Sequence, residues 1–348
     1  MGATIRLIQP GLLTTVQDLG RPGRLSMALS RGGALDRTAL VLANALVGNA
    51  ADAAGLEITG NGPTIAFEQE TAIAWTGAAF DTDLFINSRK IVSLRSHRPI
   101  VVPANSSVRW ASPKRGFRAW LAFAGGIASP QILQSRSSHL AAQVGFGRLE
   151  KDKELPLDES VAQKTQSIKA ALLKEQQELL FANRVLDTQC LVPRWSIPEQ
   201  LPPHNNILGL YAFEGRHYKL LSNEQHQQLW NSFFRVSPKS NRQGLRLEGP
   251  SLKIAGLGSL PSEPVRLGTV QLPPEGIPYL LLAEHQTTGG YPRVLEVCSS
   301  MQQALAQAGP GAQVRFIPTD LEQSQQRLQS SDRELRALVD AIEAKLRL

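Results

Sequence analysis

The chain has 348 residues and a formal net charge of +7, from 37 lysines and arginines against 30 aspartates and glutamates. These basic residues are spread along the sequence, and the densest cluster, Lys114, Arg115 and Arg118, is short and fits a solvated hairpin surface. This pattern argues against a nucleic-acid-binding protein but permits anionic small ligands. The 28 glycines, the 22 prolines and many short apolar runs indicate a mainly β chain in which helix is the minority.

Metal-binding, disulfide-bonded and membrane proteins are disfavoured by the sequence. Its two cysteines, Cys190 and Cys298, are too few and too far apart for a metal knuckle, and they fit reduced thiols in a cytoplasmic protein. The six histidines show no ligand spacing, so we predict no metal site; only His285, beside a polar loop, suggests a catalytic role. We find neither a signal-peptide pattern nor an apolar run of bilayer length, and we expect no membrane contact.

The first informative segment, residues 14–23, is polar and rich in glycine and follows an apolar opening. Gln17 and Asp18 offer an amide and a carboxylate, and Arg21 offers a planar guanidinium that suits a carboxylate or a phosphate. The alternative is a surface ion pair between Asp18 and Arg21 that merely closes a loop. Residues 36–47 then predict a helix that Gly48 terminates, with Asp36 at a position where aspartate is more often an N-cap than a catalytic base.

The middle of the chain predicts a domain boundary. Residues 62–126 contain short strand-like runs separated by polar turns, which is typical of a barrel or a sandwich. Residues 163–178 instead indicate an exposed helix, and prolines follow it. We therefore predict an N-terminal β domain over residues 1–190 and a C-terminal β domain over residues 191–318. Residues 319–348 predict a helix that packs on its own chain or on a partner subunit rather than in a long coiled coil.

Two polar blocks stand out in the C-terminal half. Residues 240–250 place Asn241, Arg242 and Glu248 around a glycine turn, after a capping-box pattern at Ser222 and Gln225. Residues 279–283 predict a buried strand. The loop after this strand combines two glycines with directional donors and acceptors, although a plain glycine turn is the alternative. The donors and acceptors are Gln286, Thr287, Thr288 and Tyr291.

These blocks occur in an order that, with residues 32–36 (GGALD) and 135–138 (SRSS), resembles the family variously called KipA, allophanate hydrolase subunit 2 or biotin-dependent carboxyltransferase subunit. The resemblance covers roughly residues 5–318. It implies a mainly β fold of two cyclophilin-like β-barrel domains with a few helices and a C-terminal helix. Glu284 and His285 depart from the family pattern, which has aspartate and arginine there, and His285 removes a permanent positive charge.

The family resemblance also implies an activity. Chains of this size in the family resemble the C-type subunit of an ATP-dependent 5-oxoprolinase, which opens the lactam of 5-oxo-L-proline to L-glutamate. Phosphorylation of the amide oxygen would remove the resonance that protects the lactam, and arginines would neutralise the phosphoryl charge. The resemblance implies ATP, with Mg²⁺, at the level of a complex with a B-type (KipI-like) subunit and an A-type (LamB/YcsF-like) subunit. We expect this chain to be inactive alone.

The polar blocks supply the candidate site for this reaction. The catalytic candidates are the carboxylates Asp18, Asp36 and Glu248 and the guanidinium of Arg242. The substrate-binding candidates are Gln17, Arg21, Arg136, Ser137, Asn241, Gln286, Thr287, Thr288 and Tyr291.

Two other functions fit the same resemblance. One is carboxyl transfer from carboxybiotin to urea or another amide; the chain has no Met-Lys-Met biotin-attachment motif, so this function needs a separate carrier. The other is a KipA-type regulatory protein that binds and antagonises a kinase inhibitor without turning over any amide.

Overall fold

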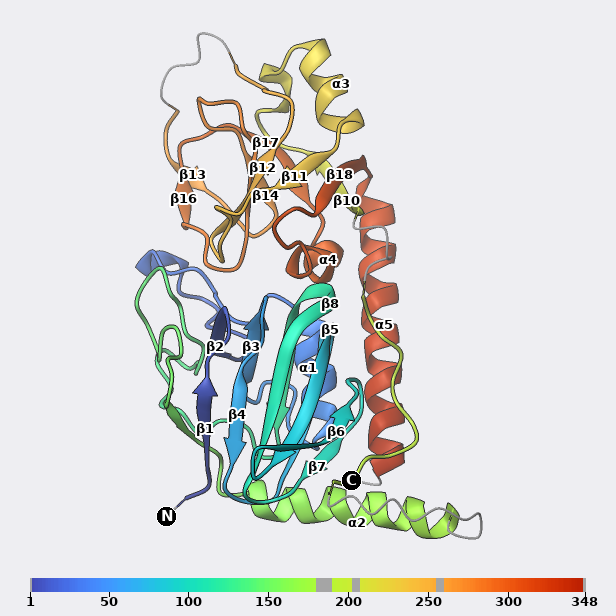
Figure 1. Ribbon diagram of the computed structural model, residues 1–348. Coiled ribbons are helices and arrows are strands. Elements are labelled where there is room, and N and C mark those ends of the chain that lie inside the picture. Colours follow the sequence, from blue (N-terminus) through green and yellow to red (C-terminus); the bar gives the residue numbers. More distant parts are fainter. Residues whose placement is uncertain (1, 180–189, 202–206, 255–259, 347–348) are drawn as a thin grey trace.

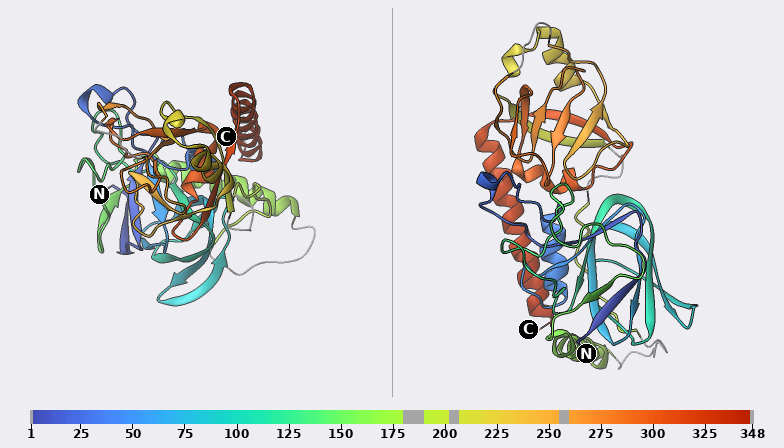
Figure 2. Two further views of the ribbon diagram at one scale, coloured as in Figure 1. Left: turned by 90° about the horizontal axis from the view of Figure 1, so that it is seen from above. Right: turned by 90° about the vertical axis from the view of Figure 1, so that its left-hand side faces the viewer.

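A computed structural model describes residues 2–179, 190–201, 207–254 and 260–346. Two β-rich bodies, one formed by strands between residues 4 and 156 and the other by strands between residues 207 and 318, follow one another along the molecule (Figure 1). The long helix α5 (Leu321–Leu346) begins beside the second body and runs along one side of the first (Figure 1, and the right-hand view of Figure 2). The mainly β architecture predicted from the sequence is confirmed.

The first body is a nine-stranded sheet in which β2, β3, β8, β4, β1 and β9 are successive neighbours and β5 pairs with β6, β7 and β8. Its long strands β5 and β8 pair antiparallel from Ile73 opposite Phe123 to Ile86 opposite Ser106. The strands are β1 (Thr4–Gln9), β2 (Leu13–Gln17), β3 (Gly55–Thr59), β4 (Thr64–Phe67), β5 (Thr71–Ile86), β6 (Arg89–Leu94), β7 (Ile100–Val102), β8 (Ser106–Phe123) and β9 (Glu154–Pro156).

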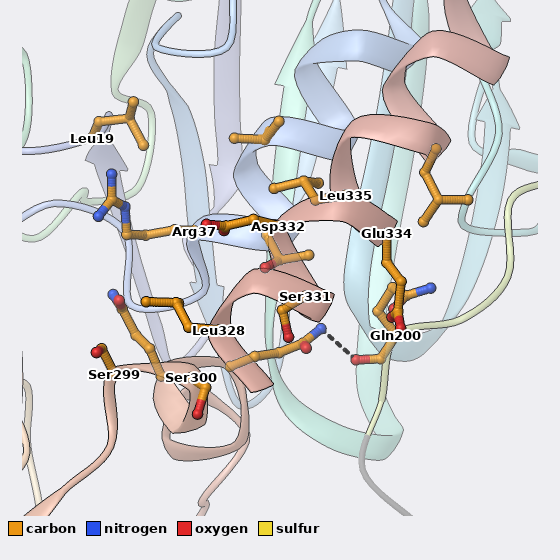
Figure 3. A pocket seen from close by; sticks show the side chains of 15 residues that line it. Leu19, Arg37, Gln200, Ser299, Ser300, Leu328, Ser331, Asp332, Glu334 and Leu335 are labelled. Atoms are coloured by element: carbon orange, nitrogen blue, oxygen red, sulfur yellow. Dashed lines mark hydrogen bonds between the residues drawn. The ribbon is translucent and has the colours of Figure 1, made fainter. Parts of the chain in front are cut away.

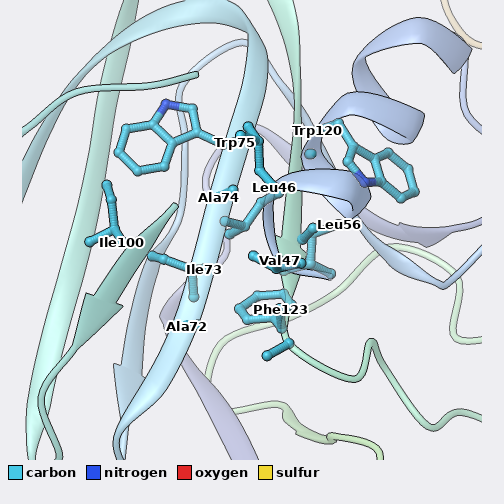
Figure 4. Close-up of a cluster of buried hydrophobic side chains, with 14 of the residues drawn as sticks. Leu46, Val47, Leu56, Ala72, Ile73, Ala74, Trp75, Ile100, Trp120 and Phe123 are labelled. Atoms are coloured by element: carbon cyan, nitrogen blue, oxygen red, sulfur yellow. The ribbon is translucent and has the colours of Figure 1, made fainter. Parts of the chain in front are cut away.

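Helix α1 (Arg37–Leu46) packs against β5 and β8 and forms part of the core of the first body. Figure 4 shows Leu46 and Val47 at its end among Leu56, Ala74 and Phe123, all of them buried. The helix predicted over residues 36–47 is confirmed, since the Asp36 side chain caps its N-terminus and Gly48 follows it with a positive φ.

The second body is a closed barrel with strand order β10, β17, β14, β15, β12, β11 and β18, and β10 lies parallel to β18. A separate two-stranded ribbon pairs β13 with β16. These strands are β10 (Ile207–Glu214), β11 (Phe234–Val236), β12 (Gly244–Glu248), β13 (Glu263–Pro264), β14 (Thr269–Gln271), β15 (Tyr279–Leu281), β16 (Thr288–Gly289), β17 (Arg293–Val297) and β18 (Gln313–Pro318).

The helical predictions are also confirmed. Residues 163–178 lie in α2 (Val161–Leu179), and Ser222 and Gln225 form the capping box of α3 (Asn223–Asn231). The boundary predicted between residues 190 and 191 adjoins residues 180–189, which lie outside the described residues, and it stays a prediction. Both cysteines are free and buried. The short helices are η1 (Leu25–Met27), η2 (Tyr218–Leu220), η3 (Ser299–Met301) and α4 (Gln302–Ala306).

Helix α5 packs on its own chain, mainly against α1, which is one of the two arrangements that the sequence left open. The heptad-spaced residues along it differ in burial, because Leu321 is 64% exposed whereas Ile342 is 1% exposed. Among the residues that the structure describes, no helix combines the length and the apolar character of a membrane span.

Replacement of Ile342 by Ala should therefore loosen α5. We expect a loss of about 2–5 kcal/mol in the free energy of unfolding, because the truncation leaves a cavity in a packed contact. Leu321→Ala on the same helix is the control and should change stability by no more than about 0.5 kcal/mol. Urea titration of the two variants measures both values, and equal effects would contradict the packing described for α5.

Candidate functional site

Arg242 is the centre of a buried ionic network at the junction of the two bodies. It precedes β12 in the second body, and its Nε donates to Glu284 Oε1 at 2.6 Å. The first body supplies two further acceptors for this guanidinium. Nη1 donates to the Glu57 carboxylate, and Nη2 donates to the Gly33 carbonyl at 2.7 Å. Carboxylates on two sides outweigh burial and raise the pKa of Arg242, so the guanidinium stays charged.

Gly33 allows this close approach. It has a φ of +82°, and a Cβ at this position would lie 2.6 Å from the backbone nitrogen of Gly20. A larger residue would therefore have to displace the Gly20 backbone. Gly33 therefore lets its own loop pack against the loop of Gly20 while its carbonyl accepts a hydrogen bond from Arg242.

Glu57 lies in the otherwise apolar strand β3 and is almost fully buried. Besides Arg242, its carboxylate accepts the Leu35 backbone N–H at 2.7 Å, and Arg118 Nε lies 4.0 Å from it. Arg118 in turn donates from Nη1 to the carbonyl of Ala306, in the second body, at 2.7 Å. Glu57 is thus held from both bodies.

The prediction that Arg118 belongs to a solvated hairpin surface is wrong. The second body covers this end of β8, so the Arg118 side chain is buried, and burial lowers its pKa to about 10. Such a group still carries its proton at neutral pH. Lys114, by contrast, is exposed and pairs with Asp81 at 2.7 Å, as expected for a surface residue.

Gln307 joins the network to helix α1. Its Nε2 donates to Asp36 Oδ2 and to the Arg118 carbonyl, both at 2.9 Å, and its Oε1 accepts the N–H of Phe117 at 2.8 Å. Asp36 also caps α1 by accepting the Ala39 N–H at 2.9 Å, which agrees with the structural role expected for it. Burial raises the pKa of Asp36 to about 6, although both hydrogen bonds oppose the shift.

Asp18 anchors the loop that follows residue 134. Its Oδ1 accepts the hydroxyls of Ser135 at 2.6 Å and Ser137 at 2.5 Å and the Gly20 N–H at 2.7 Å, while Oδ2 accepts the Arg136 N–H at 2.6 Å. A carboxylate with four donors has little capacity left for a ligand. Asp18 therefore positions residues 135–137.

Arg21 is fully buried, so the alternative of an exposed pair with Asp18 is wrong. Its Nη2 donates to the Ser137 carbonyl, and Gln17 Nε2 donates to the Ser138 carbonyl at 3.1 Å. Three buried atoms around this peptide have no hydrogen-bond partner within the described residues: Arg21 Nη1, Gln17 Oε1 and Ser138 Oγ. Unpaired buried polar atoms cost about 1–3 kcal/mol each, so a polar ligand or water is expected here.

His139 connects the Arg21 loop to the Arg242 network. Its Nδ1 accepts the Ala142 N–H at 3.1 Å, so its Nε2 carries the proton and donates to Ser30 Oγ at 2.9 Å. Glu284 Oε2 accepts the Ala141 N–H at 3.1 Å and lies 3.8 Å from His139 Nδ1. Burial lowers the pKa of His139, more than the neighbouring carboxylate raises it, and the ring is neutral at physiological pH.

In the part of the chain that the structure describes, the remaining predicted side chains form no hydrogen bond with this network. Glu248 is exposed at the far end of β12, about 13 Å along the strand from Gly244 at about 3.3 Å per residue. Asn241 is also exposed, and its Oδ1 accepts the Gln243 N–H at 2.8 Å. The Gln286–Tyr291 loop lies on the second body, where Gln286 donates to Gln271 at 2.8 Å and Tyr291 is 48% exposed.

The structure thus brings several predicted residues into one contiguous junction. The predicted residues that belong to it are Gln17, Asp18, Arg21, Asp36, Ser137 and Arg242, with the backbone of Arg136. Sequence reasoning missed Glu57, Arg118, His139 and Gln307 and gave Glu284 no role. A usable signal existed for Glu57, the one charged residue of strand β3, whereas Arg118 shares β8 with three other basic residues and gives no such signal. In the part of the chain that the structure describes, no cluster of three His, Cys, Asp or Glu side chains is arranged to hold a metal.

Removal of the Arg242 side chain should destabilise the whole chain. Arg242→Ala leaves the buried Glu284 carboxylate without its ion pair and Glu57 with only the more distant Arg118, and we expect a loss of about 3–5 kcal/mol. The control is Arg235→Ala, an exposed arginine of β11, with a change within about 0.5 kcal/mol. Denaturant titration measures both; a loss below about 1 kcal/mol for Arg242→Ala would show that the network contributes little.

Asp36 provides a pH test of the junction. Its pKa in the folded chain, about 6, lies above the ordinary 3.8, so its contribution to stability increases as the pH falls through this interval and is lost as the pH rises above it. Asp36→Asn keeps an N-cap but cannot titrate, so the parent chain should gain stability relative to the variant on acidification. Urea titrations above and below about pH 6 measure the difference, and a difference independent of pH would refute the assignment.

Comparison with known proteins places the chain in a family. The model of the carboxyltransferase domain, subdomain A and B, matches residues 27–318. The C-type subunit of 5-oxoprolinase from Escherichia coli is 33% identical over 332 residues, which cover 94% of this chain and 96% of that protein. The C-type subunit from Haemophilus influenzae is 28% identical over 311 residues, 89% of each chain.

Three longer proteins contain a region similar to this chain. Kluyveromyces lactis urea carboxylase superimposes with a TM-score of 0.79 and 26% identity over 97% of this chain, which spans 29% of that enzyme. The structure of TTHA0988 gives a TM-score of 0.71 at 28% identity over 90% of this chain, which spans 56% of that protein. Lachancea kluyveri urea amidolyase is 27% identical over 95% of this chain and 18% of its own length. From the family match and the full-length similarity to the C-type subunit of 5-oxoprolinase, the chain belongs to the family of carboxyltransferase domains with subdomains A and B.

Proposed function

We propose that this chain is the C-type subunit of an ATP-dependent 5-oxoprolinase, which hydrolyses 5-oxo-L-proline to L-glutamate together with other subunits. The similarity to the C-type subunit of the Escherichia coli 5-oxoprolinase carries the proposal, because it extends over nearly the whole length of both chains. Urea amidolyase, by contrast, matches this chain over 18% of its own length. A chain equivalent to one named subunit is expected to work with the others and to be inactive alone.

The unpaired atoms at the junction match the chemistry of the lactam. 5-Oxo-L-proline presents a carboxylate, an amide N–H and a carbonyl oxygen. Arg21 Nη1 suits the carboxylate, Gln17 Oε1 accepts a hydrogen bond from the amide N–H, and Ser138 Oγ donates to the carbonyl oxygen. Donation to that oxygen would stabilise the negative charge that develops when the lactam opens.

The three predicted carboxylates take different roles in this proposal. Asp18 holds the loop that carries Ser137 and Ser138, and Asp36 holds α1 against Gln307, so both are positioning residues. Glu248 lies outside the junction and has no role in the proposed site. The described residues do not gather a metal-binding set, so we assign the Mg²⁺–nucleotide to the assembled complex and derive no step through it on this chain.

The experiment that tests the function is reconstitution. This chain is purified with its B-type and A-type partner subunits, and release of glutamate and ADP from 5-oxo-L-proline and ATP is followed, with each subunit omitted in turn. We expect coupled release that requires this chain. No release from a complex shown to be assembled would contradict the proposal.

One pair of variants tests the proposed substrate contacts within that complex. Gln17→Met keeps the volume of the side chain but removes the acceptor for the amide N–H, and we expect kcat/KM for 5-oxo-L-proline to fall at least about tenfold. Glu248→Gln is the matched control and should stay within about twofold of the parent. Full turnover by an assembled Gln17→Met complex would show that Gln17 does not bind the substrate.

Carboxyl transfer is the second candidate, and the superposition on Kluyveromyces lactis urea carboxylase favours it. That reaction also requires an amide to be polarised beside a second substrate. If this candidate is right, labelled carbon moves from carboxybiotin to urea or another amide, and the reconstituted complex forms no glutamate from 5-oxo-L-proline.

A further inference from the structure

A second polar pocket lies away from the Arg242 network, where α1, α5 and the η3–α4 segment meet (Figure 3). Its volume is about 440 Å³, within the range of about 300–1,000 Å³ that small-molecule pockets occupy. Polar groups lining it include Arg37, Thr38, Ser300, Gln302 and Asp332. The pocket therefore offers charges and hydroxyls in a space that suits a small metabolite.

Two opposite charges face this pocket from adjacent helices. Arg37 is the first residue of α1 and partly buried, and Asp332 lies on α5 at the rim (Figure 3). Within the described residues, neither side chain forms a hydrogen bond or an ion pair, although Asp332 is close enough to act electrostatically on Arg37. Burial and the nearby Arg31 lower the pKa of Arg37, and the Asp332 carboxylate opposes this shift. A ligand between the two groups would satisfy both.

Other lining groups define the rest of the ligand. The Ser300 hydroxyl is buried and has no hydrogen-bond partner among the residues that the structure describes. Val41, Leu335 and Leu338 supply an apolar wall from the same two helices. The pocket thus combines one cation, the two carboxylates of Asp332 and Glu334, a free hydroxyl and an aliphatic surface.

We propose that this pocket binds a free α-amino acid, with its carboxylate on Arg37, its ammonium on Asp332 and its side chain against the leucines of α5. An α-amino acid carries both charges on one carbon, so it can bridge the two groups without displacing either. A carboxylic acid that lacks an ammonium would leave Asp332 unpaired and should bind less tightly.

The pocket is distinct from the junction described above, and the proposal does not depend on the proposed oxoprolinase activity. Its α5 wall, residues 321–346, lies outside residues 27–318 that match the family model. Arg37 directly follows Asp36, and Gln303 of the pocket lies one turn before Gln307. An occupied pocket would therefore touch both elements that the Asp36–Gln307 hydrogen bond joins.

Isothermal titration calorimetry of the full chain tests the proposal. The probes are L-leucine and L-glutamate, which carry both charges, and 5-oxo-L-proline, which carries the carboxylate but no ammonium. We expect at least one amino acid to bind at millimolar concentration or below, and 5-oxo-L-proline to bind to this pocket at least about tenfold more weakly. Competition with the bound amino acid separates this pocket from any lactam bound at the junction.

Four variants complete the test. Arg37→Ala and Asp332→Asn should each weaken amino-acid binding at least about tenfold, whereas Arg333→Ala and Asp340→Asn, exposed on the same helix α5 and outside the pocket, should not. Circular dichroism establishes that each variant is folded. Absence of binding by both amino acids, binding that survives both pocket substitutions, or equal affinity for 5-oxo-L-proline would overturn the proposal.

Discussion

The structure depends on burial of several charged groups between two β bodies. Each charge that leaves water costs several kcal/mol even after relaxation, and only close partners of opposite charge together with complete hydrogen bonding offset this cost. Arg242, Glu57 and Glu284 meet this condition by using partners from both bodies, whereas Arg118 Nε, 4.0 Å from Glu57, has no hydrogen-bond partner among the described residues. Neither body could satisfy these groups alone. The ionic contacts therefore specify how the two bodies fit together.

This constraint also explains where the candidate site lies. Asp18 holds residues 135–137, and Glu284 accepts the Ala141 N–H, so the loop between them has little freedom. A rigid loop keeps Arg21 Nη1, Gln17 Oε1 and Ser138 Oγ unpaired although they are buried. Such atoms are expected at a binding site, where the cost of leaving them unpaired is recovered when a polar ligand binds.

Local features of the fold could be predicted from the sequence because each has a local physical cause. Asp36 marks the start of α1, since its side chain caps the third N–H beyond it, and the capping box of α3 likewise needs only Ser222 and Gln225. The apolar run at residues 279–283 predicts β15 because its side chains are buried in the barrel. None of these elements requires knowledge of distant residues.

The junction could be predicted only in part. The ion pair of Arg242 with Glu57 joins residues 185 apart, and no periodicity links them. Arg118 looked like a surface residue because its contacts with Ala306 and Gln307, in the second body, join residues 188 and 189 apart in the sequence. Nothing in the sequence around His139 indicated a role for it. Its position beside Glu284 depends on the fold of the loop that Asp18 holds. The polar blocks around Gln17 and Ser137 contribute side chains to the junction, the block around Asn241 contributes Arg242 alone, and which atoms meet depends on tertiary contacts.

Arg242 and Glu284 form one unit of the buried network, and a double-mutant cycle measures their coupling. The free energies of unfolding of the parent chain, Arg242→Ala, Glu284→Ala and the double variant are measured by denaturant titration. We predict a coupling free energy of about 0.5–3 kcal/mol, because loss of Glu284 should cost much less once Arg242 is absent. Additivity within about 0.3 kcal/mol would mean that the two residues act independently, and it would contradict the account.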